Sequence, residues 1–330
     1  MQTALNVVIA AEFELAEKIA ELLEQGALPI EKLSLAEIYP FGEEQGLRFH
    51  NRSVEQQAIE EIDWHDKQYL FFAGESKHAA YVAQAADSGC VVIDLNGVCA
   101  VLHDVPLIVP GFNDTQLADL RNRNIVSLAD PQISQLILTA GSVLLQGEIN
   151  RVLVSSMLPA SYVNAEQVKK LAGQTARLLN GISLDDGESR LAFDVAPFNL
   201  HEPDRLLQQF QKILPNSEIQ LIIHQLQSAV FYGLGQQVTA LSDYQSDITS
   251  WQAAWADNRL LQLHSEQVIT PVSHGERYQE CDQIHISDVV ALDNGIRFWT
   301  VCDEQRFSLA LLGVKLAETV YLQGVSSQIY

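Results

Sequence analysis

The sequence predicts an α/β fold in which a domain with a parallel sheet is joined to a second, α+β domain with a largely antiparallel sheet. Its 330 residues are more than one hydrophobic core usually fills, so two domains are expected. In the first half, short apolar runs alternate with amphipathic helical stretches, which is typical of a parallel sheet with crossover helices. From residue 191 onward, strand-like runs predominate and indicate a second sheet.

The first half opens with a strand followed by a helix. Residues 5–10 (LNVVIA) are an apolar run of strand length, and residues 13–25 carry apolar side chains on one helical face before Gly26 ends the helix. Further strands are predicted at 69–73, 90–94 and 125–128, with helical stretches at 77–86 and 115–122. This order of elements predicts a Rossmann-like domain.

The second half is predicted to begin with a long apolar helix at residues 133–145 and a strand at 151–157. The next helix, residues 165–179, has a capping residue in Asn164 and a left-handed stop in Asn180-Gly181. Later strands are predicted at 219–223, 229–232, 288–292 and 296–301. The last segment, 307–322, is apolar and helical, and we expect it to return to the first domain.

Charge and composition exclude several classes of protein. Forty-two acidic and twenty basic residues give a net charge of −22, which repels phosphate backbones and anionic lipid, so we expect no nucleic-acid or membrane partner. No apolar run reaches the roughly 18 residues of a membrane span, and the first residues lack the basic start of a signal peptide. Four scattered cysteines indicate no disulfide framework. We therefore expect a cytoplasmic protein with reduced thiols.

Six segments together resemble the aspartate-semialdehyde dehydrogenase family, and more closely its Usg-type members. They are SGCVVIDLNG (88–97), DVPLIVPGFN (104–113), LAGQTARLLNGI (171–182), LAFDVAPF (191–198), VFYG (230–233) and FWTVCDEQR (298–306). By this resemblance, residues 1–131 with about 305–330 would form a degenerate NADP-binding domain, and 132–304 a substrate-like domain that forms a homodimer. The chemistry implied is the reductive dephosphorylation of an acyl phosphate with NADPH, through a cysteine thioester.

The phosphate-binding loop of that family is not kept. Its enzymes carry G-x-x-G-x-x-G between the first strand and helix, because glycines let backbone N–H groups approach a diphosphate at the helix N-terminus. The matching positions here hold Ala10, Phe13 and Ala16, and Glu12 and Glu14 place negative charge in the same turn. We interpret this segment as an ordinary helix start and expect no cofactor.

The family's nucleophile and acid/base residues are replaced as well. Its cysteine lies in N-P-N-C-S-T, and the corresponding stretch 129–135 (ADPQISQ) puts Pro131 or Ile133 at the cysteine, depending on register. Neither residue can form a thioester. The family's R-x-P-V-x-x-G-H corresponds to residues 227–234, where the arginine has become Gln227 and the histidine Leu234. Leucine cannot transfer a proton, and glutamine loses the charge-assisted grip on a carboxylate.

At three further positions matched to the family's site, the residues are not expected to bind substrate or to react. The phosphate-binding arginine falls on Ala100. Arg205 stands where the family has a substrate-contacting lysine, and we interpret it as a solvated helix charge. Ser134 lies beside the lost cysteine, but no motif histidine follows to activate it.

Other reactive side chains are interpreted as structural. Cys281, His274 and His285 could be imagined as a metal site, but their spacing matches no zinc pattern, so we predict a solvated acidic loop and no metal. The other cysteines are expected to be buried packing residues: Cys90, Cys99 and Cys302.

The leading hypothesis is a folded homodimer that keeps the dehydrogenase scaffold without its chemistry and acts by binding an unknown protein or small ligand. Two alternatives stay open. One is an oxidoreductase of altered chemistry in amino-acid biosynthesis, for which NADP would be the cofactor. The other is an active aspartate-semialdehyde dehydrogenase whose residues come from elsewhere in the chain, with Cys302 as its thiol.

Overall fold

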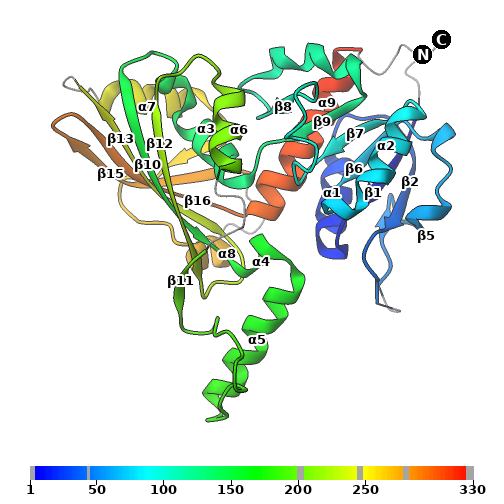
Figure 1. Ribbon diagram of the computed structural model, residues 1–330, viewed down its shortest axis with the longest axis horizontal. Helices are drawn as coiled ribbons and strands as arrows, with labels where there is room; N and C mark the ends of the chain where they lie inside the picture. The colour runs from blue at the N-terminus through cyan, green and yellow to red at the C-terminus, as the bar shows by residue number, and fades with distance from the viewer. Residues whose placement is uncertain (1–3, 43–44, 199–203, 244–247, 278–281, 325–330) are drawn as a thin grey trace. The chain divides into compact units, whose positions relative to one another are not determined.

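The computed structural model describes residues 4–42, 45–198, 204–243, 248–277 and 282–324. The chain divides into two compact units, which we call unit 1 (Met1–Asp130 with Ser308–Tyr330) and unit 2 (Pro131–Phe307). Among the described residues, each unit is built on one seven-stranded sheet (Figure 1). No helix of these residues combines the length and apolar character that crossing a membrane requires.

Unit 1 contains a parallel sheet with the strand order β5-β2-β1-β6-β7-β9-β8, and neighbouring strands pair in parallel throughout. The strands are β1 Leu5–Ala10, β2 Ile30–Glu37, β5 Glu55–Ala58, β6 Tyr69–Phe72, β7 Val91–Asp94, β8 Leu107–Ile108 and β9 Ile125–Leu128. A small hairpin, β3 Arg48–Phe49 and β4 Arg52–Ser53, stands apart from this sheet. The predicted Rossmann-like domain with a parallel sheet is therefore confirmed.

The helices of unit 1 connect these strands. They are α1 Phe13–Gln25, α2 Ala79–Asp87 and α9 Leu312–Leu322, with 3-10 turns η1 Ile59–Glu61, η2 Trp64–Asp66, η3 Ser76–His78 and η4 Asp114–Asn122. Strand β1 and helix α1 have the predicted bounds, whereas the helical stretch predicted at 115–122 is a 3-10 helix. Strand β2 was not predicted, because it opens with the partly or fully exposed Ile30-Glu31-Lys32 and shows its apolar character only from Leu33 onward.

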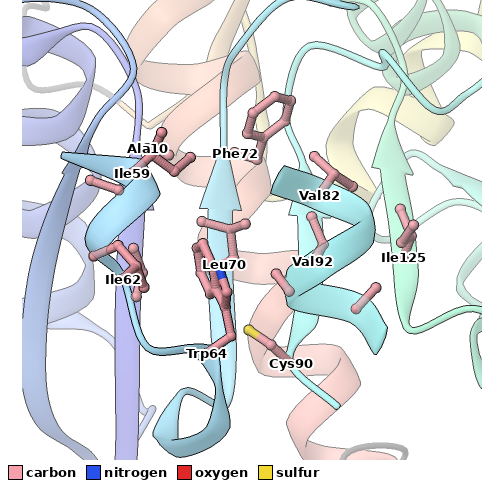
Figure 2. Close-up of a cluster of buried hydrophobic side chains, with 14 of the residues drawn as sticks. Ala10, Ile59, Ile62, Trp64, Leu70, Phe72, Val82, Cys90, Val92 and Ile125 are labelled. Carbon is pink, nitrogen blue, oxygen red and sulfur yellow. The ribbon is translucent and has the colours of Figure 1, made fainter. Parts of the chain in front are cut away.

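An apolar cluster packs α2 against strands of the parallel sheet. Figure 2 shows Leu70, Phe72 and Val92 from the strands packed with Val82 of α2 and Trp64 of η2. Burying each such side chain stabilises the fold by about 1.5–3 kcal/mol. Ala10, the last residue of β1, belongs to the same cluster, so the segment between β1 and α1 is anchored in the core.

Helix α9 brings the carboxyl-terminal part of the chain into unit 1. The Glu318 carboxylate accepts a hydrogen bond of 2.7 Å from the backbone N–H of Ala27, just after α1. Gly313 lies so close to Leu95 that a Cβ at this position would be 2.5 Å from the leucine Cδ2. This glycine therefore permits the close approach of α9 to the end of β7.

Unit 2 contains a mixed sheet with the order β11-β12-β10-β13-β16-β15-β14. Its strands are β10 Ile149–Leu158, β11 Val195–Pro197, β12 Gln220–Ser228, β13 Leu234–Ser242, β14 Leu261–Leu263, β15 Ile284–Leu292 and β16 Gly295–Cys302. Pairs β10–β12 and β14–β15 are parallel, and the other neighbours are antiparallel. The predicted largely antiparallel sheet is confirmed.

Unit 2 contains six α-helices among its described residues. They are α3 Pro131–Leu144, α4 Ala160–Val163, α5 Ala165–Leu179, α6 Arg205–Ile213, α7 Ile248–Asp257 and α8 Pro271–Arg277. Helix α3 contacts α6, α7, β10 and β13. Trp251 and Trp255 of α7 pack on Phe298 with ring centroids 5.6 and 5.2 Å away. Along β10 buried and half-buried residues alternate, as expected for a strand with one covered face.

Several predicted bounds in the second half of the chain were wrong, and strands β12 and β15 are longer than the predicted 219–223 and 288–292. Residues 229–232 form the bend between β12 and β13 instead of a strand, because the carbonyl groups of Val230 and Phe231 accept hydrogen bonds from Ala160 and Ser161. Helix α3 starts at Pro131, where a proline needs no N–H partner. The last predicted helix begins earlier, as a π-helix (η5, Glu304–Leu311) that continues into α9.

Replacing Asn164 with alanine should lower the free energy of unfolding by about 1 kcal/mol, because its side chain accepts a hydrogen bond from the backbone N–H of Gln167 at the start of α5. Denaturant unfolding checks this value. Gln167→Ala is the matched control, since it keeps the backbone donor and should change stability by less than about 0.5 kcal/mol. Equal effects of both substitutions would contradict a capping role.

Candidate functional site

The start of α1 in unit 1 is built from apolar side chains. Ala10 at the end of β1 and Ala16 in the first turns of α1 are fully buried. The ring of Phe13 meets the ring of Phe41 edge-on, with centroids 5.5 Å apart and an interplanar angle of 73°. An aromatic pair therefore stands at the helix start, in the segment that the sequence analysis matched to a glycine-rich loop.

Negative charge gathers beside the same helix start. The Tyr39 hydroxyl donates a hydrogen bond of 3.1 Å to Glu75, which also pairs with Lys77 at 3.1 Å. Burial, followed by the charges of Glu75 and Glu12, raises the pKa of the Tyr39 hydroxyl. Glu12 and Glu75 thus act on one side chain, and Glu14 adds a third carboxylate in the first turn of α1.

A buried aspartate shapes the turn after β7. Asp94 accepts hydrogen bonds from the backbone N–H groups of Val98 and Cys99, at 3.1 and 2.7 Å, and from the Ser127 hydroxyl at 2.7 Å. Burial raises the pKa of its carboxyl group. Ala100, the position matched to a phosphate-binding arginine, follows this turn and is buried. The turn is therefore well formed but presents no basic group at that position.

In unit 2, the positions matched to the nucleophile lie in the first turn of α3. Pro131 begins the helix and is buried, and both Ile133 and Ser134 are fully buried. Leu234, matched to the acid/base histidine, begins β13 and is fully buried opposite Cys302 in the ladder with β16.

The remaining matched positions lie on β12 and α6. Gln227 is half-buried near the end of β12, opposite Leu158 of β10 and Ala196 of β11. Arg205 is the first residue of α6 and is partly buried, so its prediction as a solvated charge describes only part of the side chain.

Gln135 joins the start of α3 to the sheet. Its side-chain amide donates to the Thr300 hydroxyl at 2.6 Å and to the Leu234 carbonyl at 3.4 Å. Its carbonyl oxygen accepts from the Cys302 thiol at 3.2 Å. The structure therefore brings the helix that carries Ile133 together with Leu234 and Cys302 through a buried glutamine.

Two more buried glutamines extend this polar core. The Gln236 amide donates to the Gln132 carbonyl at 3.0 Å and to the Ser156 hydroxyl at 3.1 Å, and the Gln132 side chain donates to the Tyr162 hydroxyl at 2.8 Å. We call Gln132, Gln135 and Gln236 the glutamine cluster. Each is at most 1% exposed.

The glutamine cluster was not predicted from the sequence. A signal was present, because Gln236 has the two-residue spacing of the buried Val238 and Ala240 and so lies on the covered face of β13. It was missed because the strand was predicted at 229–232.

Glu304 is a buried acid that the sequence analysis also missed. It is 1% exposed, and its carboxylate accepts hydrogen bonds from the Ser161 hydroxyl and, at 3.0 Å, from the backbone N–H of Gly233. Burial, and next the charge of Asp303, raises the pKa of the Glu304 carboxyl group to about 7. Gly233 has φ +99°, a conformation that favours glycine, and it directly precedes Leu234. Glu304 therefore holds the turn from which β13 starts.

The described cysteines are buried, as predicted. Cys90 and Cys302 are fully buried and Cys99 nearly so. Burial, with a smaller contribution from Asp94, raises the pKa of the Cys99 thiol to about 12. Since the thiolate is the reactive form, such a thiol is a poor nucleophile at neutral pH.

The prediction of a solvated acidic loop was wrong for His274 and His285. His274 is 3% exposed in α8 and His285 is fully buried in β15. The His285 ring contacts the rings of both His264 and His274. Cys281 lies outside the described residues. Within the described ranges, no three His, Cys, Asp or Glu side chains gather in a way that could hold a metal ion. His264 was not singled out from the sequence, because a lone histidine after a short strand gives no signal.

Comparisons of sequence and of structure with known proteins agree on one family. The family model "Semialdehyde dehydrogenase, NAD binding domain" matches residues 14–120. A USG-1 protein homolog of Haemophilus influenzae is 52% identical over 326 residues, covering 98% of this chain and 100% of the relative. The aspartate-semialdehyde dehydrogenase of a Shewanella species is 26% identical, covering 95% and 96%. The crystal structure of aspartate semialdehyde dehydrogenase II from Vibrio cholerae superposes with a TM-score of 0.89 at 25% identity, covering 97% and 99%.

Replacing Glu304 with glutamine should remove a pH-dependent part of the stability. The pKa of this carboxyl is about 7 in the folded protein against an ordinary 4.5, so its contribution is full below pH 4.5 and is lost as the pH rises through 7. Between pH 5.5 and 8.5 the wild type should lose about 2 kcal/mol relative to Glu304→Gln. Urea unfolding at several pH values measures this difference. The exposed Glu148→Gln is the control and should follow the wild type.

Proposed function

Because this chain belongs to the aspartate-semialdehyde dehydrogenase family, in its group of USG-1 homologs, we propose that it is a non-catalytic member that acts through binding or interaction. One observation carries the proposal. The positions matched to the nucleophile and the acid/base hold Ile133 and Leu234, both fully buried, and Gln135 fills the space between α3, β13 and β16 with hydrogen bonds.

The nucleophile position favours this proposal in detail. When the proline of the family's N-P-N-C-S-T motif is matched to Pro131, the cysteine falls on Ile133 and the following serine on Ser134. Isoleucine offers no nucleophile, and Ser134 is fully buried in the first turn of α3. Cys302 is a poor replacement, because its thiol is buried and donates a hydrogen bond to Gln135.

The acid/base and arginine positions point in the same direction. Leu234 contributes only its backbone carbonyl to the polar core, where that group accepts from Gln135. Gln227 is an uncharged residue of β12 in place of an arginine that would bind a carboxylate. Loss of a nucleophile and its base together typically lowers a rate on the order of 10⁶-fold.

The side chains at the start of α1 disfavour binding of a dinucleotide in the family's pose. Phe13 packs on Phe41, and Glu12 lies in the turn where a diphosphate would need backbone N–H groups and no negative charge. A carboxylate about 4 Å from a phosphate costs on the order of 4 kcal/mol at an effective dielectric constant of about 20. The family match begins at residue 14, after both Ala10 and Phe13.

One observation favours the alternative of an oxidoreductase with altered chemistry. Residues 14–120 match an NAD-binding domain family, so a nucleotide in another pose on unit 1 is the specific form of that alternative. A thermal-shift series with NAD, NADP and their reduced forms separates the two functions. A ligand at 100 times its dissociation constant stabilises the folded protein by about 2.7 kcal/mol, so binding would be visible.

The purified protein should not turn over aspartyl phosphate with NADPH, and NADP should not raise its melting temperature, because Ile133 and Leu234 offer no reacting groups and Glu12 repels phosphate. NADPH absorbance and thermal unfolding measure the two effects. An active aspartate-semialdehyde dehydrogenase serves as the positive control. Turnover at ordinary enzymatic rates would refute the proposal, and a shift without turnover would leave a nucleotide-binding protein.

We also propose that the chain forms a homodimer through β10, β12 and β13, on the face of the unit 2 sheet opposite to α3 and α7. On this face Leu153 of β10 stands between Ile222 of β12 and Thr239 of β13, in register, and all three are half-buried. Trp299 of β16, opposite Gln237, borders this surface, where its indole donates a hydrogen bond to the Ile269 carbonyl. Such a mixed apolar and polar surface is typical of protein interfaces.

Leu153→Asp should therefore shift the molecular mass in solution from two chains to one chain of 36.6 kDa, since it buries a charge at the centre of the proposed interface. Light scattering coupled to size-exclusion chromatography gives the mass. Leu145→Asp, at a 66% exposed leucine after α3, should leave the mass unchanged. A wild-type mass of one chain would contradict the proposal.

A further inference from the structure

Three histidines from three elements of unit 2 meet in one cluster, which we call the histidine triad. His264 follows β14, His274 lies in α8 and His285 in β15. The Nε2 atom of His264 and the Nδ1 atom of His285 are 2.8 Å apart, so one ring nitrogen donates a hydrogen bond to the other. The His274 ring meets the His285 ring edge-on, with centroids 5.1 Å apart.

The short contact between His264 and His285 excludes a positive charge on both rings at once. A hydrogen bond between two imidazole nitrogens needs one N–H and one lone pair, and a proton on both rings would put two donors and two positive charges face to face. The third ring, His274, lies against the same His285 and would repel the added charge.

The surroundings of the triad also disfavour charge. His285 is fully buried and His274 is 3% exposed. Burial, followed by the neighbouring His274 and His264, lowers the pKa of His285 to about 3. Burial also lowers the pKa values of His264 and His274. The charged group that acts in the opposite direction is Asp303, which follows β16 and favours a proton on His274.

The triad ties a weakly paired segment to the rest of the sheet. This segment, residues 261–277, contains β14 and α8, and we call it the edge segment. Strand β14 pairs with β15 over three residue pairs, at the edge of the sheet. Beyond β14, the His264 N–H donates to the Ile286 carbonyl at 2.8 Å, and the Trp299 indole donates to the Ile269 carbonyl at 2.7 Å. A third hydrogen bond joins the Ile269 N–H to the Ser287 hydroxyl of β15, at 3.2 Å.

Solvent reaches the outer member of the triad. His264 lines a surface pocket of about 380 Å³ together with Glu266 and Asp288, among other residues. Protons and water can therefore reach His264 without unfolding of unit 2. The two carboxylates at the pocket favour a positive charge on the ring once it has turned outward.

We propose that the histidine triad is a proton-operated latch, which keeps the edge segment closed on β15 and β16 at neutral pH and releases it when the medium is mildly acidic. The closed state holds uncharged rings, and the open state lets the same rings take up protons in water. Because the open state binds more protons, acidification shifts the equilibrium towards it. This role is independent of the proposed loss of catalysis, since none of the three histidines occupies a position matched to the family's reacting groups.

The size of the effect follows from linkage. A histidine in water has a pKa of about 6.5, and the closed state keeps His285 uncharged far below that pH. With one proton taken up on opening, the equilibrium constant for opening rises about tenfold between pH 7.5 and 5.5. A second proton would raise it further.

Amide hydrogen exchange of the full chain, in the presence of EDTA, tests the latch. Opening is read at the amides of His264 and Ile269, which donate to Ile286 and Ser287 of β15, after correction for the intrinsic pH dependence of exchange. Their protection should fall about tenfold between pH 7.5 and 5.5. The amides of Val154 and Val238, in the central β10–β13 ladder of the same unit, should lose no protection at pH 5.5, because protonation of Glu304 stabilises the folded chain at the lower pH, and they report any global loss of stability.

Two variants separate the triad from a general effect of acid. His285→Gln keeps a hydrogen-bonding side chain beside His264 but removes the buried ring whose proton uptake sets the ratio, and it should reduce the tenfold ratio to below threefold. His285→Asn, a smaller substitution at the same position, should do the same; if either variant fails to fold, the other carries the test. His224→Gln, at an exposed histidine of β12 in the same sheet, should keep the tenfold ratio.

Two results would overturn the proposal. One is a wild-type ratio at the edge-segment amides that equals the ratio at Val154 and Val238. The other is an unchanged tenfold ratio in His285→Gln or His285→Asn. Neither result bears on the absence of dehydrogenase activity, because the exchange experiment measures no turnover.

Discussion

Gln135 must satisfy its hydrogen bonds inside the core of unit 2, and the positions of α3, β13 and β16 depend on it. A buried amide without partners costs about 1–3 kcal/mol, and here the amide reaches Thr300, the Leu234 carbonyl and the Cys302 thiol at once. The helix and two strands are therefore fixed at one distance from each other. The family scaffold survives in unit 2 although its reacting groups do not, because this polar contact and the apolar Ile133 and Leu234 stabilise the same arrangement.

The architecture was largely predictable from the sequence. Apolar runs of strand length and a strong helical face gave β1 and α1 with their observed bounds, since buried parallel strands leave a continuous apolar signal. Strand β13 was not predicted, because Gln236 and Gln237 interrupt its apolar pattern and the turn at Gly233 depends on a carboxylate 71 residues away in sequence. Contacts of that range leave no local trace in the chain.

Of the candidate site, the sequence predicted only the positions at which the family's reacting groups are replaced. Comparing residues with the motifs of a resembling family identified Ile133 and Leu234, whose burial fits the proposed loss of chemistry. Other polar groups of the core, among them Glu304 and the glutamine cluster, match no sequence motif. They become recognisable when strand register brings Gln236 beside Ser156 and Gly233 beside Glu304. Polar residues in a core are thus interpretable only with their partners in view.

The aromatic pair at the start of α1 has a consequence for how such a chain can change over generations. Putting glycine back at residue 13 would remove the edge-to-face contact with Phe41, at a cost of about 0.5–1.5 kcal/mol, and add the helix penalty of glycine. Ala10 and Ala16 are packed without free space, and Glu12 would still repel a dinucleotide. A protein that regained the glycines one at a time would therefore pass through less stable intermediates, in which Glu12 still opposes binding of a dinucleotide. Packing at the start of α1 therefore disfavours an evolutionary return to a glycine-rich loop.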